Sequence, residues 1–324
     1  MNEDKLISII VPFKNEEKFL GKCIDSITGQ TYSNLEILVV VDHSSESSVS
    51  FVNKIAKKDS RIVPLILTKQ KGAQAARFEG LENARGERIM FVDSDDLLRP
   101  QAVELLSAAM DNYDVDLVQM RFIRRFYRFN WHYKESYDPH LSEKRIEGDE
   151  YMRLSSYVGM ESLINPSLWG KLYRTPLLRI LKPTPFEQFW GDDQICNIDY
   201  LRLARSMAFI DYVGYIYRWG GRTSKFEFSN LEKYKNVYRL KLKLGQDPDS
   251  LRKELHLLLR YYIRQMNTEL GWTRDALIII LKKELEDPLW EGIISIDEIE
   301  TLVDKEFSDL HQSAFKTIIK RLLR

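Results

Sequence analysis

The sequence contains little cysteine. Its 324 residues include only Cys23 and Cys196, and the five histidines are scattered along the chain. Neither cysteine belongs to a CxxC pair, so the sequence predicts neither a disulfide framework nor a zinc site. Two isolated cysteines in helix-like patterns are typical of a protein from a reducing compartment.

The sequence also lacks an excess of charge of either sign. Lys and Arg total 48, Asp and Glu total 48, and the formal net charge is zero. A balanced chain has no bulk attraction for nucleic acid, so we expect no nucleic-acid partner. Hydrophobic residues make up 44% of the chain, which is too many for a disordered protein and typical of a globular one.

Long apolar runs are absent as well. The longest, at residues 276–281, is far shorter than the ~20 residues of a membrane span. The first five residues are acidic where a signal peptide would be basic. We therefore expect a cytoplasmic protein, with at most peripheral contact at the inner face of the membrane.

Apolar runs and amphipathic stripes alternate along the first part of the chain. This alternation predicts a mostly parallel α/β sheet with helical crossovers. The expected strands lie at residues 6–11, 35–41, 62–67, 88–92, 115–122 and 212–219, and the expected helices at 16–28, 47–58, 72–84, from Pro100 onward, and 191–205. Beyond residue 226 the pattern is helical only, so we place a domain boundary there. Ligands of such sheets bind beyond the carboxyl ends of the strands, which indicates the loops at 12–16, 42–46 and 93–96.

The loop at residues 93–96 carries the strongest chemical signal. Asp93, Asp95 and Asp96 follow an apolar strand directly, and clustered carboxylates near a core repel one another. A divalent cation with oxygen ligands relieves that repulsion, and in an extended Asp-x-Asp segment the two side chains point the same way. The alternative is that Asp95 or Asp96 caps the helix near Pro100.

An ordered series of segments resembles the inverting family-2 glycosyltransferases of the GT-A fold, over roughly residues 6–225. The order and spacing of these segments carry the resemblance, since no single one is specific. They are residues 9–16 (IIVPFKNE), 26–32 (SITGQTY), 36–45 (EILVVVDHSS), Ala76-Arg77 with Gly80-Leu81, 91–96 (FVDSDD), Trp169 with Lys171-Leu172-Tyr173, and Asp192-Asp193.

The resemblance implies a Rossmann-like GT-A domain at 1–225, with a nucleotide-binding half at 1–115 and an acceptor-binding half at 116–225, followed by a helical region at 226–324. It also implies a nucleotide-diphospho-sugar donor, preferably UDP-linked, a glycan or lipid-linked acceptor, and a role in bacterial surface polysaccharide synthesis. The implied donor-site residues are Pro12, Lys14, Asn15, Glu16, Asp42 at the nucleobase, Arg77, Asp93 at the ribose and metal, and Ser94. Asp95 is the implied main ligand of Mn²⁺ or Mg²⁺.

Asp192 resembles the catalytic base of the family, and Asp193 is the second candidate. Such a carboxylate removes the proton of the acceptor hydroxyl while its oxygen attacks the anomeric carbon, and the single displacement inverts that carbon. The simpler interpretation is that Asp192 caps the helix that follows.

Four positions depart from the family pattern: Lys14, Val41, His43 and Phe78. Three of them surround the expected nucleotide pocket, so the identity of the nucleobase stays open. They also motivate a second hypothesis, a non-catalytic relative that serves as a binding or assembly subunit.

Two further segments have two interpretations each. The stretch at residues 124–131 contains aromatic and basic side chains that suit a sugar acceptor, and it is equally typical of a hairpin. The basic amphipathic stripe at 315–324 suits either an anionic membrane or packing against other helices or a second subunit. The segment Tyr217-Arg218-Trp219, with Arg222 and Ser224, is similar to a Tyr-Arg segment of the family that follows the base, and the resemblance implies that it reaches the donor phosphates or the acceptor.

Overall fold

The structure is a computed structural model, which describes residues 5–126, 129–134, 138–159, 162–182, 191–219, 230–270, 273–291, 294–295 and 297–306. Its backbone separates into two compact units. Unit 1 consists of Met1–Ser224 with Lys243–Gly245, and unit 2 of Lys225–Leu242 with Gln246–Arg324.

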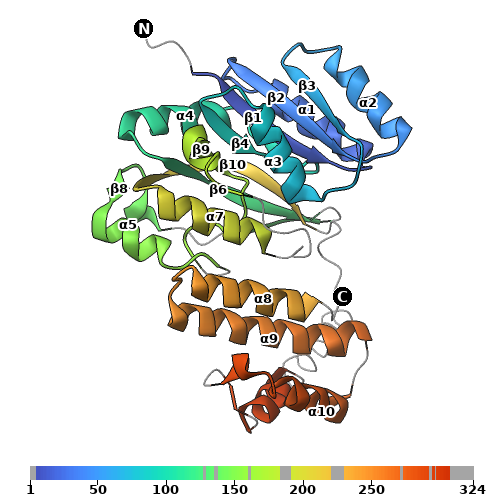
Figure 1. The fold of residues 1–324 in the computed structure, drawn as a ribbon, viewed down its shortest axis with the longest axis vertical. Coiled ribbons are helices and arrows are strands. Elements are labelled where there is room, and N and C mark those ends of the chain that lie inside the picture. Colours follow the sequence, from blue (N-terminus) through green and yellow to red (C-terminus); the bar gives the residue numbers. More distant parts are fainter. Residues whose placement is uncertain are drawn as a thin grey trace, which may run out of the picture. The chain divides into compact units, whose positions relative to one another are not determined.

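Unit 1 alternates strands and helices in the order that the sequence predicts (Figure 1). Its strands are β1 (Ile7–Phe13), β2 (Leu35–Asp42), β3 (Ile62–Leu67), β4 (Arg88–Phe91), β5 (Leu97–Leu98), β6 (Leu117–Phe126), β7 (Phe129–Lys134), β8 (Ile146–Glu147), β9 (Lys171–Arg174) and β10 (Ser206–Trp219). Its helices are α1 (Glu17–Thr28), α2 (Glu46–Ala56), α3 (Ala73–Asn83), α4 (Ala102–Tyr113), η1 (Pro139–Leu141), α5 (Gly148–Ser155), α6 (Thr175–Leu178) and α7 (Asp192–Leu203).

One sheet joins all of these strands. Its order is β3-β2-β1-β4-β9-β6-β10-β5, with β7 paired to β6 and β8 paired to β10. The pairs β1–β2, β1–β4, β2–β3 and β6–β10 are parallel, and the other five pairs are antiparallel. The expected α/β fold is confirmed, but the sheet is mixed, and only its β3-β2-β1-β4 part is entirely parallel. The antiparallel β6–β7 pair agrees with the hairpin interpretation of the stretch near residue 124.

Strand β1 is buried on both faces, which explains its continuous apolar sequence. Ile9 belongs to the core cluster that includes residues of α1, α2 and α4. Ile10 faces the other way and packs against α3, where a Cβ built on Gly80 would lie only 2.5 Å from Ile10 Cγ2. Glycine at position 80 therefore lets α3 approach the sheet closely.

The short antiparallel strands were not predicted from the sequence. Strand β9 lies between β4 and β6, and its four residues begin with Lys171 and end with Arg174. A four-residue strand with a charge at each end has no periodicity to detect, and only its neighbours in the sheet make it a strand. Its position divides the sheet into a β3-β2-β1-β4 half and a β6-β10 half.

Unit 2 is helical in the part of the chain that the structure describes. It contains α8 (Asn230–Lys243), α9 (Pro248–Leu270), α10 (Arg274–Glu284) and η3 (Pro288–Trp290). On α9, Leu251, Leu255 and Leu259 are buried. Among the described residues, no helix combines the length and hydropathy that crossing a bilayer demands. The basic stripe at residues 315–324 lies outside the described residues.

Candidate active site

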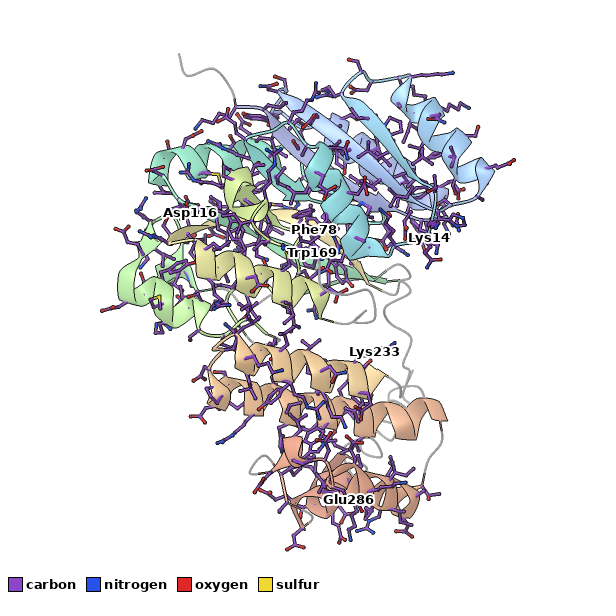
Figure 2. All side chains as sticks on the ribbon, viewed as in Figure 1. Lys14, Phe78, Asp116, Trp169, Lys233 and Glu286 are labelled. Atoms are coloured by element: carbon purple, nitrogen blue, oxygen red, sulfur yellow. The ribbon has the colours of Figure 1, made fainter. Side chains whose placement is uncertain are left out.

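The three loops that the sequence singled out meet at one edge of unit 1. The Asn15 side-chain oxygen accepts a hydrogen bond of 2.9 Å from the Ser45 amide, which joins the loop after β1 to the loop after β2. Arg218 of β10 contacts both Glu16 and Asp95, which joins the first loop to the third. Lys14, half-buried at this edge, is labelled in Figure 2.

Two of these loops contain non-glycine residues with left-handed backbone. Asn15 has φ of 50° and His43 has φ of 42°. His43 occupies the position where the family pattern has glycine, the residue that adopts positive φ without steric cost. Backbone of this kind is retained where surrounding structure holds it, and it is common at ligand sites.

The acidic loop forms a tight turn rather than the extended segment that we expected. The Asp96 amide donates to the Asp93 carbonyl at 3.0 Å, and Ser94 and Asp95 occupy the middle of the turn. The capping alternative is wrong, because α4 begins only at Ala102 after strand β5, and its N-cap residue is Gln101. The acidic side chains are therefore left for contacts at the edge of the sheet.

Asp96 forms the buried base of this turn. Its carboxylate accepts hydrogen bonds from the Tyr215 hydroxyl at 2.6 Å and from the Arg218 amide at 2.7 Å. Burial, together with the like charges of Asp93 and Asp95, raises the pKa of Asp96 well above its usual range. Burial also raises the pKa of Asp93, although the Arg77 guanidinium opposes that rise. The corner thus holds more negative charge than its surroundings compensate.

Arg77 of α3 joins the acidic turn to α7. Its Nη2 lies 2.6 Å from Asp93 Oδ1 and its Nη1 lies 2.9 Å from Asp193 Oδ1. Burial alone would lower the pKa of Arg77, but the two carboxylates raise it above its usual value. Arg77 is therefore a fixed cation between the acidic turn and the expected base.

The two candidate bases have different surroundings. Helix α7 begins at Asp192 after Gly191, whose φ of 83° is left-handed, and no side chain caps the helix. The expectation that Asp192 caps α7 is therefore wrong. Asp192 Oδ1 is buried without a hydrogen-bond partner, and burial together with the charge of Asp193 raises the pKa of Asp192 to about 7. Asp193 instead contacts Arg77 and accepts from the Leu168 amide at 3.3 Å.

The remaining expected donor-site residues take several positions. Pro12 is buried inside β1, while Ser94 is half-buried and Asn15 exposed. Asp42, at the end of β2, is 4% exposed and accepts hydrogen bonds from the Lys71 amide at 2.7 Å and the Gly72 amide at 3.0 Å. Asp42 thus fixes the loop that leads into α3.

Several residues that support this corner had no role assigned from the sequence. Trp169 stacks on Tyr215, with ring centroids 4.5 Å apart, and on Tyr217 at 5.2 Å. Lys171 is buried, and its ammonium donates to the carbonyls of Asn165 and Ser167, just before the Leu168 amide that contacts Asp193. Trp169 and Lys171 belong to a segment that carried the family resemblance, so their signal was present without a role attached.

Buried polar atoms without partners concentrate at this edge. Among the described residues, five buried side-chain atoms lack a hydrogen-bond partner, and only Ser142 Oγ belongs to none of α3, α7 and the loop after β2. The other four are Ser44 Oγ, Arg77 Nε, Asp192 Oδ1 and Gln194 Oε1. An unpaired buried polar group costs about 1–3 kcal/mol, so such a concentration is typical of a site that a ligand completes.

The donor set of the acidic turn suits a hard divalent cation. Asp93 and Asp95 present carboxylate oxygens, the ligand type that Mg²⁺ and Mn²⁺ prefer. The nearby Cys23 thiol donates to the Asp93 carbonyl at 3.5 Å, and burial raises its pKa, which disfavours the thiolate form that binds metals. The crowding of Asp93, Asp95 and Asp96, whose like charges add to the effect of burial in raising the pKa of Asp93 and Asp96, is a second feature that such a cation relieves.

Comparisons with known proteins agree with this geometry. Residues 8–168 match the model of the family described as "Glycosyl transferase family 2". Glycosyltransferase GlyA of Streptococcus pneumoniae is 31% identical over 220 residues, which cover 66% of this chain and 31% of GlyA. The uncharacterized glycosyltransferase EpsJ of Bacillus subtilis is also 31% identical over 220 residues, covering 66% of this chain and 61% of EpsJ. The chain therefore spans less than two thirds of the length of these curated relatives.

Solved structures show the same fold. S. aureus TarS 1–349 in complex with UDP-GlcNAc superposes with a TM-score of 0.65 at 19% identity, covering 94% of this chain and 92% of that one. The mannosyltransferase PcManGT from Pyrobaculum calidifontis, in complex with GDP-Man and Mn²⁺, gives a TM-score of 0.55 at 16% identity, covering 95% and 88%. Family match, curated relatives and fold agree that residues 8–168 of this chain form a domain of glycosyl transferase family 2, in a chain with the GT-A fold of these solved structures.

Proposed function

We propose that this enzyme is a divalent-metal-dependent, inverting glycosyltransferase that moves a sugar from a UDP-sugar to a hydroxyl of a glycan or lipid-linked acceptor. The observation that carries the proposal is the corner where Arg77 joins Asp93 of the acidic turn to Asp193 at the start of α7. This corner brings a cation site and a candidate base within the reach of one guanidinium.

The donor side of the reaction belongs to the acidic turn and the neighbouring loops. Asp95 and Asp93 would hold Mn²⁺ or Mg²⁺, which when bound supplies Lewis-acid stabilisation of the diphosphate leaving group. Asp42 and the half-buried Lys14 and Ser94 line the loops assigned to the nucleotide. Arg77 keeps its positive charge between the two acidic groups and orients Asp93.

The acceptor side belongs to the carboxylate pair at the start of α7. Asp193 lies nearer the acidic turn, because Arg77 joins it to Asp93. Asp192 has the unpartnered oxygen and the pKa of about 7, close to the value that suits a general base at neutral pH. One of these two carboxylates removes the acceptor proton, and the other fixes its surroundings.

Nucleotide-sugars screened for thermal stabilisation, with and without Mn²⁺, test the donor class. A UDP-sugar is expected to stabilise the protein only when Mn²⁺ is present, and the transferred sugar is expected to appear with inverted anomeric configuration by NMR. Stabilisation that needs no metal would overturn the metal assignment. Absence of binding and transfer with every donor would favour a non-catalytic role.

Asparagine variants at the start of α7 identify the base. The variant that removes the base is expected to lower kcat by about 10²–10⁴-fold while UDP-sugar still stabilises the protein. If Asp192→Asn and Asp193→Asn both lower kcat only slightly and to the same extent, neither carboxylate is the catalytic base. Asp199→Asn, on the same helix and paired with Arg202, is the matched control.

A further inference from the structure

Arg218 is the cation nearest to Asp95 among the described ion pairs. Its backbone is fixed to the acidic turn, because the Arg218 amide donates to Asp96 Oδ1 at 2.7 Å and Tyr215, on the same strand, donates to Asp96 Oδ2. The Arg218 side chain therefore leaves β10 directly beside the expected metal ligand.

The guanidinium of Arg218 is held on three sides. Its Nε lies 3.0 Å from Asp95 Oδ2, and Nη2 donates to the same oxygen. Nη2 also lies 3.5 Å from Glu16 Oε2, and the guanidinium carbon sits 3.7 Å from the centroid of the Phe19 ring. Cation–π contact and two carboxylates keep this charge at the corner.

A metal ion and the guanidinium would repel each other if both were bound to the Asp95 carboxylate. Mg²⁺ binds carboxylate oxygen at about 2.0–2.1 Å, so an ion on Asp95 Oδ2 would lie beside the guanidinium that already donates to it. Repulsion between them is strong because the side chains of Arg218 and Asp95 are only 15% and 22% exposed. A metal ion without its nucleotide therefore competes with Arg218 for Asp95.

A diphosphate changes this balance, because it brings oxygens that a guanidinium binds as well as it binds carboxylate. On the basis of the function proposed above, we propose that Arg218 is the resident counter-ion of Asp95, and that it moves from Asp95 to the diphosphate when metal and nucleotide bind together. Arg218 thereby makes the two affinities depend on each other, and such coupling is reciprocal. The enzyme would bind little metal until the donor arrives.

Binding of Mn²⁺ alone tests the first half of the proposal without any activity measurement. The loss of the free-ion EPR signal gives the affinity of the nucleotide-free full chain. Arg218→Met is expected to bind Mn²⁺ about tenfold more tightly than the wild type, because the competing cation is gone. The control Arg121→Met removes a β6 arginine that pairs with Asp211 instead, and is expected to leave Mn²⁺ affinity unchanged.

Binding of UDP, measured by calorimetry with and without saturating Mn²⁺, tests the second half. Mn²⁺ is expected to strengthen UDP binding by tenfold or more in the wild type, and by clearly less in Arg218→Met, within the range of about 5–150-fold for such couplings. Arg218→Lys keeps a charge but loses the paired donors, so it is expected to fall between the two. If Arg218→Met does not fold, Arg218→Lys takes its place in both binding measurements.

The outcomes separate this inference from the proposed function. Unchanged Mn²⁺ affinity and unchanged coupling in both Arg218 variants would overturn the inference while leaving metal-dependent transfer intact. A wild type that binds no Mn²⁺, with or without UDP, would overturn the proposed function itself. Weaker Mn²⁺ binding in the nucleotide-free Arg218→Met would show that Arg218 organises the site instead of competing for it.

Discussion

Arg77 Nη1 lies 2.9 Å from Asp193 Oδ1, and this ion pair joins α3 to the first turn of α7. Helix α3 packs on β1 and β2 through Gly80, whereas α7 contacts β9 through the ring pair of Tyr200 and Tyr173. One buried arginine of α3 thus connects the acidic turn to a candidate base at the start of α7.

Replacing Arg77 with methionine is expected to lower the free energy of unfolding by less than the roughly 3–5 kcal/mol that breaking a fully buried ion pair costs, because Asp93 and Asp193 lose their cation but are each 27% exposed. Urea denaturation of unliganded protein measures the loss. In an Asp193→Asn background the same change is expected to cost clearly less, since one of the two carboxylates is already neutral. Equal losses in the two backgrounds would mean that Arg77 and Asp193 do not interact energetically.

Removal of the metal is expected to abolish transfer. Chelation should lower the rate about 100-fold or more, since Lewis-acid stabilisation of the leaving group supplies several kcal/mol, and added Mn²⁺ should restore it. Asp95→Asn should not recover at the Mn²⁺ concentration that restores the wild type. Asp25→Asn, an exposed carboxylate on α1, is the control and should behave like the wild type. Full activity of chelated enzyme would exclude the metal role.

The sequence predicted the parallel part of the sheet because its strands are buried on both faces. In a chain that alternates strands and helices, continuous apolar runs such as residues 6–11 and 35–41 predict strands covered on both faces. β1 and β2 are buried along their whole length, as this pattern predicts. The same reasoning predicted that the loops at residues 12–16, 42–46 and 93–96 lie at one edge of the sheet. The contacts of Asn15 and Arg218 confirm that these loops lie together.

Four features of the site could not be obtained in that way. The sequence of the acidic turn does not reveal the Asp96–Asp93 hydrogen bond that closes it, so the extended form was expected instead. Strand β9 is too short for periodicity, and the sequence around Arg218 does not reveal that β10 places this arginine beside Asp95. The difference between Asp192 and Asp193 likewise comes from Arg77, which is 115 positions or more away in sequence.

The close packing of α3 on β1 gives a stability prediction with a matched control. Gly80→Ala places a methyl group 2.5 Å from Ile10 Cγ2 and 3.2 Å from a Val40 methyl, so it is expected to lower the free energy of unfolding by about 1–3 kcal/mol despite the better helix propensity of alanine. Gly21→Ala on α1 meets only Phe51 at 3.6 Å, an ordinary contact, and should raise stability by about 0.5–1 kcal/mol. Thermal unfolding of the two variants measures both signs. Stabilisation by Gly80→Ala would mean that α3 has room to move away from the sheet.

The rate of transfer is expected to rise with pH through neutrality. Burial and the charge of Asp193 raise the pKa of Asp192 to about 7, so the ionised fraction of Asp192 increases about tenfold between pH 6 and pH 8. If Asp192 is the base, Asp192→Asn removes nearly all of the rate. If Asp193 is the base, Asp192→Asn keeps much of the rate but loses this rise. A wild-type profile that is flat from pH 6 to pH 8 at saturating donor and metal would contradict both cases.

The Asp192 carboxyl group also makes stability depend on pH. Its contribution to stability is expected to fall as pH rises, whereas the rate of transfer is expected to rise. Its pKa is raised above the unfolded value, so the folded protein binds more protons than the unfolded chain between about pH 4 and pH 7, and the stability contribution of Asp192 falls as pH rises through that window. Asp192→Asn removes the dependence, because an amide does not ionise. The variant should therefore gain thermal stability relative to wild type as the pH is raised from 5 to 8, with the difference level above pH 8. Since Asp192 is only partly buried, solvent screens part of the effect, and the comparison rests on the pH dependence of the difference between the two proteins. A difference that is constant from pH 5 to pH 8 would mean that Asp192 ionises normally in the folded enzyme, and a carboxyl group that ionises normally would not account for a rise of the rate near pH 7.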